Sequence, residues 1–377
     1  MPVPSLPNEL IDQILRYECL EDDDLIQACL VSKSWLEPAR KSLWSELWID
    51  VIEQEEDSID GNPYPRRANY RMRSVCWKLV AVLELQPELA SFVKLIGFEA
   101  YGPPAVTSYS VSGISTSIPD LISSLLRLCP SATSFSFGHD EWLDREYLSS
   151  YEPHFDRLKE VEIEDCSGSW WFEFITKLPN LRSLSLAGRP RLPSWAIHST
   201  VSGIQEIHLG ASCDVQAFEI LSIGSRSSLR SLTVPLNLLA VVDLSQYPNL
   251  RRLGLNECGD APSYNAIQWF LERLESSGLD TLHFSAEATQ QLYKVSNLRS
   301  HIPSSCRRIN LDGAWTLDVV VSLIHRPEQD EAGVQIAQLG VPEPFVNGEA
   351  GGYMETAVVG LKAIVEYAGV ELVWIDS

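Results

Sequence analysis

Four hexapeptides near the middle of the chain share one pattern: LRSLSL (181–186), IQEIHL (204–209), LRSLTV (229–234) and LRRLGL (250–255). In each of them, apolar residues occupy the first, fourth and sixth positions. Alternation over the last three positions is typical of a short strand with one buried face. Six further hexapeptides repeat the pattern, and they begin at Val93, Ala132, Leu158, Leu279, Cys306 and Val370. The sequence therefore predicts a body built from repeated strands.

The spacing of these hexapeptides points to a solenoid. Successive starts are 39, 26, 23, 23, 25, 21, 29, 27 and 64 residues apart, so the middle steps fall mostly in the range of leucine-rich repeats. Residues 91–377 resemble that family, which implies short parallel strands with helical or irregular returns, such as 264–278. The rival fold is a doubly wound α/β domain. It would need longer, more continuously apolar strands and a G-x-G-x-x-G turn, which the sequence lacks.

Three repeats carry Cys or Asn eight residues after the start of the hexapeptide, at Cys166, Asn237 and Cys258. In leucine-rich repeats this position faces inward and bonds the backbone of the neighbouring turn. The resemblance thus implies that the two cysteines are structural, rather than nucleophiles or metal ligands. Because the other repeats lack the residue, the expected solenoid is irregular.

The first fifty residues predict three short helices. Pro7 suits the first turn of a helix, and Leu10, Ile11, Ile14 and Leu15 then form a stripe with i, i+4 spacing. A second helix begins at the acids 22–24 and carries apolar residues almost all the way round, and a third stretch carries them from 38 to 49. A unit of about 50 residues buries only about 60% of its unfolded surface. The surplus apolar surface must therefore meet another surface.

The segments LPNELIDQIL (6–15), DLIQACLVSKSW (24–35) and LWSELWI (43–49) together resemble an F-box along its whole length. With the repeats, the chain is similar to fungal-type F-box proteins with a leucine-rich-repeat body. In that family the F-box binds the Skp adaptor, which joins a cullin scaffold carrying a RING protein and a charged E2. By matching positions, the resemblance assigns adaptor contacts or their immediate support to Leu6, Pro7, Leu10, Ile14, Leu15, Leu30, Val31, Trp35, Leu43 and Trp44. The open alternative is a helical cap for the body behind it, with Trp35 and Trp44 as core.

The expected fold is α/β, with three parts. A three-helix F-box spans 1–50, an acidic hinge with a linking helix spans 51–90, and the solenoid spans 91–377. Seven acids and no base lie between Glu46 and Asp60, and Asp60-Gly61-Asn62-Pro63 then breaks regular structure. Residues 327–352 are rich in Pro, Gly and acid, and predict a mobile insertion. A helix over 353–367 and a last strand follow.

Charge and cysteine usage limit the partners and the compartment. The net charge of −22 disfavours binding to nucleic acid or an anionic membrane. The start has no secretory pattern, and no apolar run approaches the roughly 20 residues that cross a bilayer. The eight cysteines are scattered, without a C-x-x-C pair, which disfavours a disulfide framework or a zinc site. We expect a cytoplasmic or nuclear protein with free thiols and no cofactor.

No common catalytic motif is present. The sequence lacks G-x-S-x-G, a GKS/T loop and H-E-x-x-H, so we expect a non-catalytic subunit. His208 and His283 occupy the same strand position, but three repeats separate them. At about 4.8 Å per strand the two imidazoles would be about 15 Å apart, too far to share a metal ion.

Outward strand positions, the third and fifth of each hexapeptide, are candidates for binding a target. Their residues are acidic in the N-terminal repeats and basic in the C-terminal repeats. We hypothesise that a protein target contacts Glu160, Glu162, Glu206, His208, Arg252, His283 and Arg308. Its basic part would lie near the glutamates, and an acidic or phosphorylated part near the arginines. The alternative for each residue is a solvated surface with no partner.

Three functions follow from these patterns. The first is a substrate-recognition subunit of a Skp-cullin-F-box ubiquitin ligase, which binds the adaptor through 1–50 and an unidentified protein substrate through the repeats. The second is a Skp-binding interaction protein outside a cullin ligase. The third is an α/β enzyme whose site matches no common motif.

Overall fold

The computed structural model divides the chain into two compact units, Met1–Leu181 and Arg182–Ser377. Each unit is considered by itself. The structure describes residues 7–15, 22–52, 78–101, 108–111, 114–138, 148–149, 151–164, 166, 168–198, 201–238, 241–256, 274, 277–285, 302–311, 336, 338–342, 361–362, 365–366 and 370–375.

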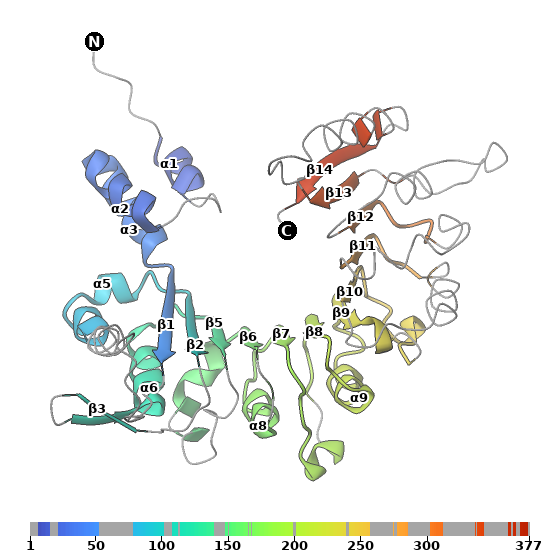
Figure 1. Cartoon of the computed structure of the whole chain (residues 1–377), viewed down its shortest axis with the longest axis horizontal. Helices are drawn as coiled ribbons and strands as arrows, with labels where there is room; N and C mark the ends of the chain where they lie inside the picture. The colour runs from blue at the N-terminus through green and yellow to red at the C-terminus, as the bar shows by residue number, and fades with distance from the viewer. Residues whose placement is uncertain are drawn as a thin grey trace, which may run out of the picture. The chain divides into compact units, whose positions relative to one another are not determined.

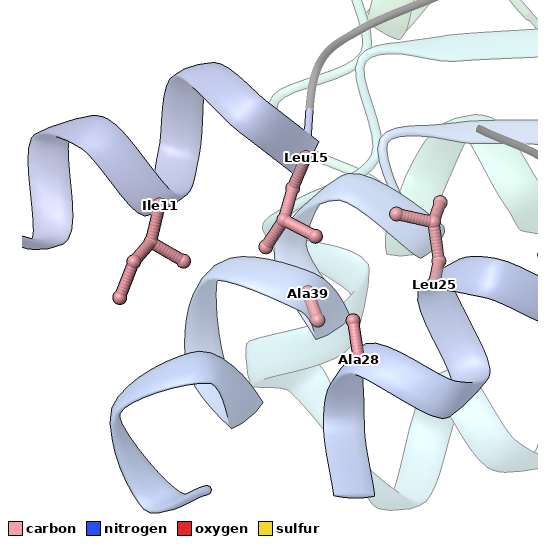
Figure 2. Packing of buried hydrophobic residues seen from close by; sticks show 5 residues of the cluster. All are labelled: Ile11, Leu15, Leu25, Ala28 and Ala39. Atoms are coloured by element: carbon pink, nitrogen blue, oxygen red, sulfur yellow. The ribbon is translucent and has the colours of Figure 1, made fainter. Parts of the chain in front are cut away.

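The first unit begins with three helices, α1 (Asn8–Leu15), α2 (Asp22–Val31) and α3 (Lys33–Leu43) (Figure 1). Their shared core is small. Figure 2 shows its five buried side chains, and α1 contributes two, α2 two and α3 one: Ile11, Leu15, Leu25, Ala28 and Ala39. The Ser42 hydroxyl of α3 also donates a hydrogen bond of 2.7 Å to the Leu15 carbonyl oxygen, which ties the end of α1 to α3.

The third helix is shorter than the apolar pattern over 38–49 indicates. It ends at Leu43, and Leu47, Trp48 and Ile49 lie instead on strand β1 (Glu46–Ile52). Their burial alternates, because Leu47 and Ile49 are buried whereas Trp48 is exposed. Trp44-Ser-Glu-Leu-Trp-Ile49 is therefore an eleventh copy of the repeated hexapeptide. The hinge expected from residue 51 also starts later, since β1 runs to Ile52.

Four parallel strands of the first unit lie in the order β1-β2-β5-β6. The last three are β2 (Leu95–Tyr101), β5 (Ser134–Phe137) and β6 (Glu160–Ile163). The other elements are residues 78–85, which are helical, α5 (Pro87–Ala90), the antiparallel pair β3 (Ser108–Val111) and β4 (Ile114–Ser117), α6 (Ile118–Leu128), η2 (Glu152–Arg157) and α8 (Trp170–Thr176). The acidic residues 53–60 lie outside the described residues.

Aromatic rings fill the core of the first unit. The rings of Phe98 and Phe135, on neighbouring strands, stack at 5.7 Å between centroids. Phe174 of α8 meets Phe137 and Phe155 edge to face, at 5.6 and 5.2 Å. Such pairs add about 0.5–1.5 kcal/mol each beyond the area that they bury. The inward residues of the strands thus pack against the returning helices.

The parallel strands of the second unit are β7 (Ser183–Leu186), β8 (Glu206–Leu209), β9 (Ser231–Pro235), β10 (Arg252–Asn256), β11 (Thr281–Phe284), β12 (Arg308–Leu311), β13 (Gln338–Pro342) and β14 (Glu371–Ile375). Each pairs with the next in chain order. The described returns are η3 (Ser194–His198), α9 (Val215–Ile223), η4 (Leu236–Leu238) and η5 (Leu244–Gln246). In neither unit does the strand order reverse, as it would in a doubly wound domain. The mixed α/β arrangement is consistent with a repeat solenoid.

All ten predicted hexapeptides contain a strand, so this prediction is confirmed. Burial also alternates as expected, since the fourth and sixth residues face the core in β6, β7, β8, β9, β11 and β12. Gly254 occupies an outward position of its strand, β10, but is buried. A Cβ there would come within 2.6 Å of the Thr233 hydroxyl oxygen on β9, so only glycine leaves room for that side chain.

The prediction of a mobile insertion over 327–352 does not hold for residues 338–342. They form β13, which pairs with β12 and β14. Ile336, Leu339 and Val341 are buried, and they are the apolar positions of a twelfth hexapeptide, IAQLGV (336–341). The 64-residue gap from Cys306 to Val370 therefore divides into steps of 30 and 34 residues. Most of the helix expected over 353–367 lies outside the described residues, but 361–362 and 365–366 are helical, with Leu361 and Val365 buried.

The repeat resemblance predicts three inward-facing residues eight positions after the start of a hexapeptide, and their outcomes differ. Cys166 is buried, and its thiol contacts the Ile163 carbonyl oxygen of its own repeat at 3.7 Å. Asn237 is exposed on η4, so its predicted inward role is wrong. Cys258 lies outside the described residues. Other side chains do bond the backbone of another repeat: the Asn249 amide donates to the Ser227 carbonyl oxygen at 2.7 Å, and the Asn256 amide donates to the Leu209 carbonyl oxygen, at the end of β8, at 3.3 Å.

Candidate functional site

Large apolar side chains are exposed on all three N-terminal helices. Leu30 and Val31, at the end of α2, have the largest exposed fractions, 76% and 64%. Leu36 of α3 has the smallest, 39%. We call the following six residues the exposed apolar set: Leu10, Ile14, Ile26, Leu30, Val31 and Leu36.

The exposure follows from helix geometry and from the size of the core. On α1, Ile11 and Leu15 are four residues apart and fill the core, while Leu10 and Ile14 form a second i, i+4 pair beside them. Two of the five core side chains are alanines, so the core that the three helices share contains only three large aliphatic side chains. The remaining stripe stays in water even in the presence of the rest of the chain.

Burial of the exposed apolar set against another surface would lower the free energy. Burial of apolar surface releases about 25 cal/mol per Å², which is on the order of 1 kcal/mol for a half-exposed Leu or Ile side chain. Six such residues on a unit of three helices are more than single scattered apolar side chains, and exposed apolar surface of this kind is typical of interaction sites. Scattered single apolar residues would not support that conclusion.

The ten residues assigned to adaptor binding fall into two groups. Pro7, Leu10, Ile14, Leu30 and Val31 are exposed and available to a partner. Leu15 is buried in the helical core, Trp35 and Leu43 pack against that core, and Trp44 is half-buried, so these four could act only as support or at an edge. Leu6 lies outside the described residues.

Two members of the exposed apolar set, Ile26 and Leu36, were not among the residues assigned from the sequence. Ile26 lies four residues before Leu30, so both project from one face of α2. That spacing could have identified Ile26. No spacing signal distinguishes Leu36 from its neighbour Trp35, which packs against the core.

The outward face of the strands carries the second group of assigned residues. Glu160 and Glu162 are exposed on β6, and Glu160 accepts a 2.7 Å hydrogen bond from the Ser134 hydroxyl on β5. In the second unit, Arg308 is exposed on β12 and His283 is half-buried on β11. These residues occupy the expected outward positions of their strands.

Two of the expected target residues bind each other. The Arg252 guanidinium on β10 forms an ion pair with the Glu206 carboxylate on β8, across the intervening β9. Next to it, the Asn256 amide lies 2.9 Å from Nε2 of His208. Because Glu206 and Arg252 neutralise each other, the boundary between acidic and basic repeats is less sharp than the sequence indicates.

The described residues give little support for a chemical site. Burial raises the pKa of the Cys129, Cys213 and Cys306 thiols to about 12, so at neutral pH they are protonated and are poor nucleophiles. His208 and His283 are separated by the register positions Thr233 and Gly254, which places them about 15 Å apart, as expected. Within the described part of the chain, no group of three His, Cys, Asp or Glu side chains could hold a metal ion.

The fold and the exposed apolar set define a class of protein, a strand-repeat body that carries a small helical module with exposed apolar side chains. Comparison with protein families identifies the module. The model of the F-box-like family matches residues 3–50, so the chain contains an F-box-like domain that includes α1, α2 and α3. No curated protein matches the chain. None of the described helices is long and apolar enough to cross a membrane.

Proposed function

We propose that this chain is a substrate-recognition subunit of a Skp-cullin-F-box ubiquitin ligase. The observation that carries the proposal is the exposed apolar set, which lies within the matched F-box-like domain. An F-box-like domain supports binding to a Skp-type adaptor. Exposed leucine, isoleucine and valine side chains on a helical unit are the groups that such an interface would bury.

Adaptor binding would use the exposed members of the assigned set and leave the core intact. Leu30 and Val31 would bury the most new surface, because they are the most exposed. Ile11 and Leu15 would hold the helices in place and not touch the adaptor. The assigned residues would thus divide into contacts (Pro7, Leu10, Ile14, Leu30 and Val31) and supports (Leu15, Trp35, Leu43 and Trp44).

The chain would be non-catalytic and would act by tethering. A target held on the outward face of the repeats would be presented to an E2 bound elsewhere in the complex. Tethering raises the effective concentration of the target lysine, and the reacting groups would belong to the other subunits. Glu160, Glu162, Glu206, His208, Arg252, His283 and Arg308 remain the proposed target-binding residues. The free thiols of the described cysteines support a reducing compartment, the cytoplasm or nucleus.

Reconstitution with purified components separates this proposal from the two alternatives. The tagged chain is mixed with a Skp-family adaptor and then with a cullin–RING pair, and the captured proteins are separated on a gel. We expect both the adaptor and the cullin to be captured. Capture of the adaptor alone would favour an interaction protein outside the ligase. Capture of neither would contradict the proposal and leave an α/β enzyme as the remaining reading.

A further inference from the structure

The first unit presents an aromatic side chain on the outward face of its strands. Trp48 of β1 pairs in register with Gly97 of β2, and a Cβ on Gly97 would lie 2.3 Å from Cε3 of the indole. The indole therefore lies over the bare backbone of β2. It remains 45% exposed, so part of the ring is open to solvent.

One carboxylate borders this ring, and two more lie farther along the sheet, on β6. The Trp48 ring nitrogen donates a 3.3 Å hydrogen bond to the Glu46 carboxylate, which places that carboxylate at the edge of the indole and leaves the ring face open. Glu160 and Glu162 lie on β6, two strands beyond Gly97, at a distance of about 10 Å. The described outward side chains of β1, β2, β5 and β6 include no lysine, arginine or histidine: Glu46, Trp48, Leu95, Gly97, Ser134, Ser136, Glu160 and Glu162.

The outward strand positions of the two units differ in charge. In the second unit, Arg252 already neutralises Glu206, and Arg308 adds a further positive charge. Among the described outward strand positions of the first unit, the charged residues are Glu46, Glu160 and Glu162, all negative. Lys94 and Lys159 lie just before β2 and β6, outside these positions. An aromatic face with carboxylates at its edge favours a cation, because the ring quadrupole and the carboxylates attract the same charge.

We propose that this face of the first unit docks a basic segment of a protein partner, with one Lys or Arg cation over the Trp48 indole. An extended chain rises about 3.3 Å per residue, so a second cation three residues along lies about 10 Å away, at Glu160 and Glu162. The favoured motif has two cations three residues apart. This inference rests on the proposed function, because the segment would belong to the ligase target.

Fluorescence anisotropy with labelled peptides tests the site on the full chain. The probe is RGGRGG, and the comparison peptide is EGGEGG. We expect only the arginine peptide to bind, and its binding to weaken as salt rises. Trp48→Leu keeps an apolar group over Gly97 but removes the π face, and should weaken binding about five- to tenfold. Glu160→Gln should weaken it about threefold, as expected for one exposed ion pair.

Matched controls separate this site from general attraction to a chain of charge −22. Trp195→Leu removes another exposed tryptophan, in the second unit, and Glu88→Gln removes an exposed carboxylate of α5. Both should leave the affinity unchanged. Equal affinity of wild type, Trp48→Leu and Glu160→Gln would overturn the inference, as would the absence of peptide binding. Adaptor capture is measured on the same wild-type preparation, so that failure of this site is distinguished from failure of the proposed function.

Discussion

The indole of Trp48 occupies the space that a side chain at position 97 would need, since a Cβ on Gly97 would come within 2.3 Å of the ring. This contact joins β1, which follows the N-terminal helices directly, to β2 of the repeat body. It has a direct consequence for stability.

We predict that Gly97→Ala destabilises the protein by about 1–3 kcal/mol, because the ring must move off the strand. Urea unfolding followed by circular dichroism measures the change. Gly278→Ala is the control, since the nearest atom to its Cβ would be the end of a flexible arginine side chain at 3.4 Å. In a Trp48→Leu background the cost of Gly97→Ala should fall. An unchanged cost would show that the ring is not the obstacle.

The Asn256 side chain replaces a missing backbone donor. The residue after a hexapeptide normally donates its N–H to the end of the preceding strand, as Gly210 does to Leu186 at 2.7 Å and Ser285 to Leu255 at 2.8 Å. Pro235 holds this position on β9 and has no N–H to offer Leu209. Asn256, its register partner on β10, donates to that carbonyl instead.

Asn256→Leu should therefore cost about 1–3 kcal/mol of unfolding free energy, because the Leu209 carbonyl loses its side-chain donor. Chemical denaturation measures it. Pro235→Ala restores a backbone N–H, so in that background the same substitution should cost less than half as much. Asn249→Leu is the control, since its hydrogen bond to Ser227 is exposed. Equal costs in both backgrounds would contradict the replacement.

The helical core should respond to truncation far more than its outer surface does. Ile11→Ala removes a fully buried side chain and should cost about 2–5 kcal/mol. Ile14→Ala, one turn along the same helix, removes a half-exposed one and should cost under about 1 kcal/mol. Hydrogen exchange of the α1 and α3 amides reports the local change. Similar loss of protection in both variants would argue against the division into core and exposed set.

Buried thiols make stability depend on alkaline pH. The pKa of Cys213 rises from 9.0 to about 12 because burial disfavours the thiolate. The unfolded chain therefore loses the thiol proton above pH 9 while the folded chain retains it. This contribution to stability is complete below pH 9 and is lost as pH rises toward 12.

At pH 10.5, we expect Cys213 alone to account for about 1–2 kcal/mol of the stability lost relative to pH 8. Urea midpoints at the two pH values, for wild type and Cys213→Ala, measure this contribution as a difference. The cavity left by the substitution lowers both values of the variant equally. Identical pH dependence in the two proteins would contradict the assignment.

Strand positions could be predicted from the sequence because the hexapeptide combines a period of two with regular spacing. The copies at Trp44 and Ile336 were missed for different reasons. Trp44 begins 49 residues before the next copy and follows a helical pattern, and Ile336 lies in a segment rich in Pro, Gly and acid. In both cases the pairing with a neighbouring strand decides the structure, and pairing is a non-local property.

The exposed helical residues could be predicted only as a group. Leu15 and Leu30 are the same residue type on two of the N-terminal helices, yet one is 3% and the other 76% exposed. The difference depends on how the helices cross, which periodicity alone does not give. The ion pair between Glu206 and Arg252 was likewise missed, because the partners are 46 residues apart and meet only through strand register.

The affinity of the purified chain for a Skp-family adaptor, measured by isothermal titration calorimetry, tests the central claim most directly. Leu30→Glu places a charge within the exposed apolar set and should weaken binding at least about tenfold while leaving the urea midpoint unchanged. Leu85→Glu, at an 82% exposed leucine outside the F-box-like domain, should bind as wild type does. Equal adaptor affinity of the Leu30→Glu variant and wild type would contradict the assignment of this surface as the adaptor site.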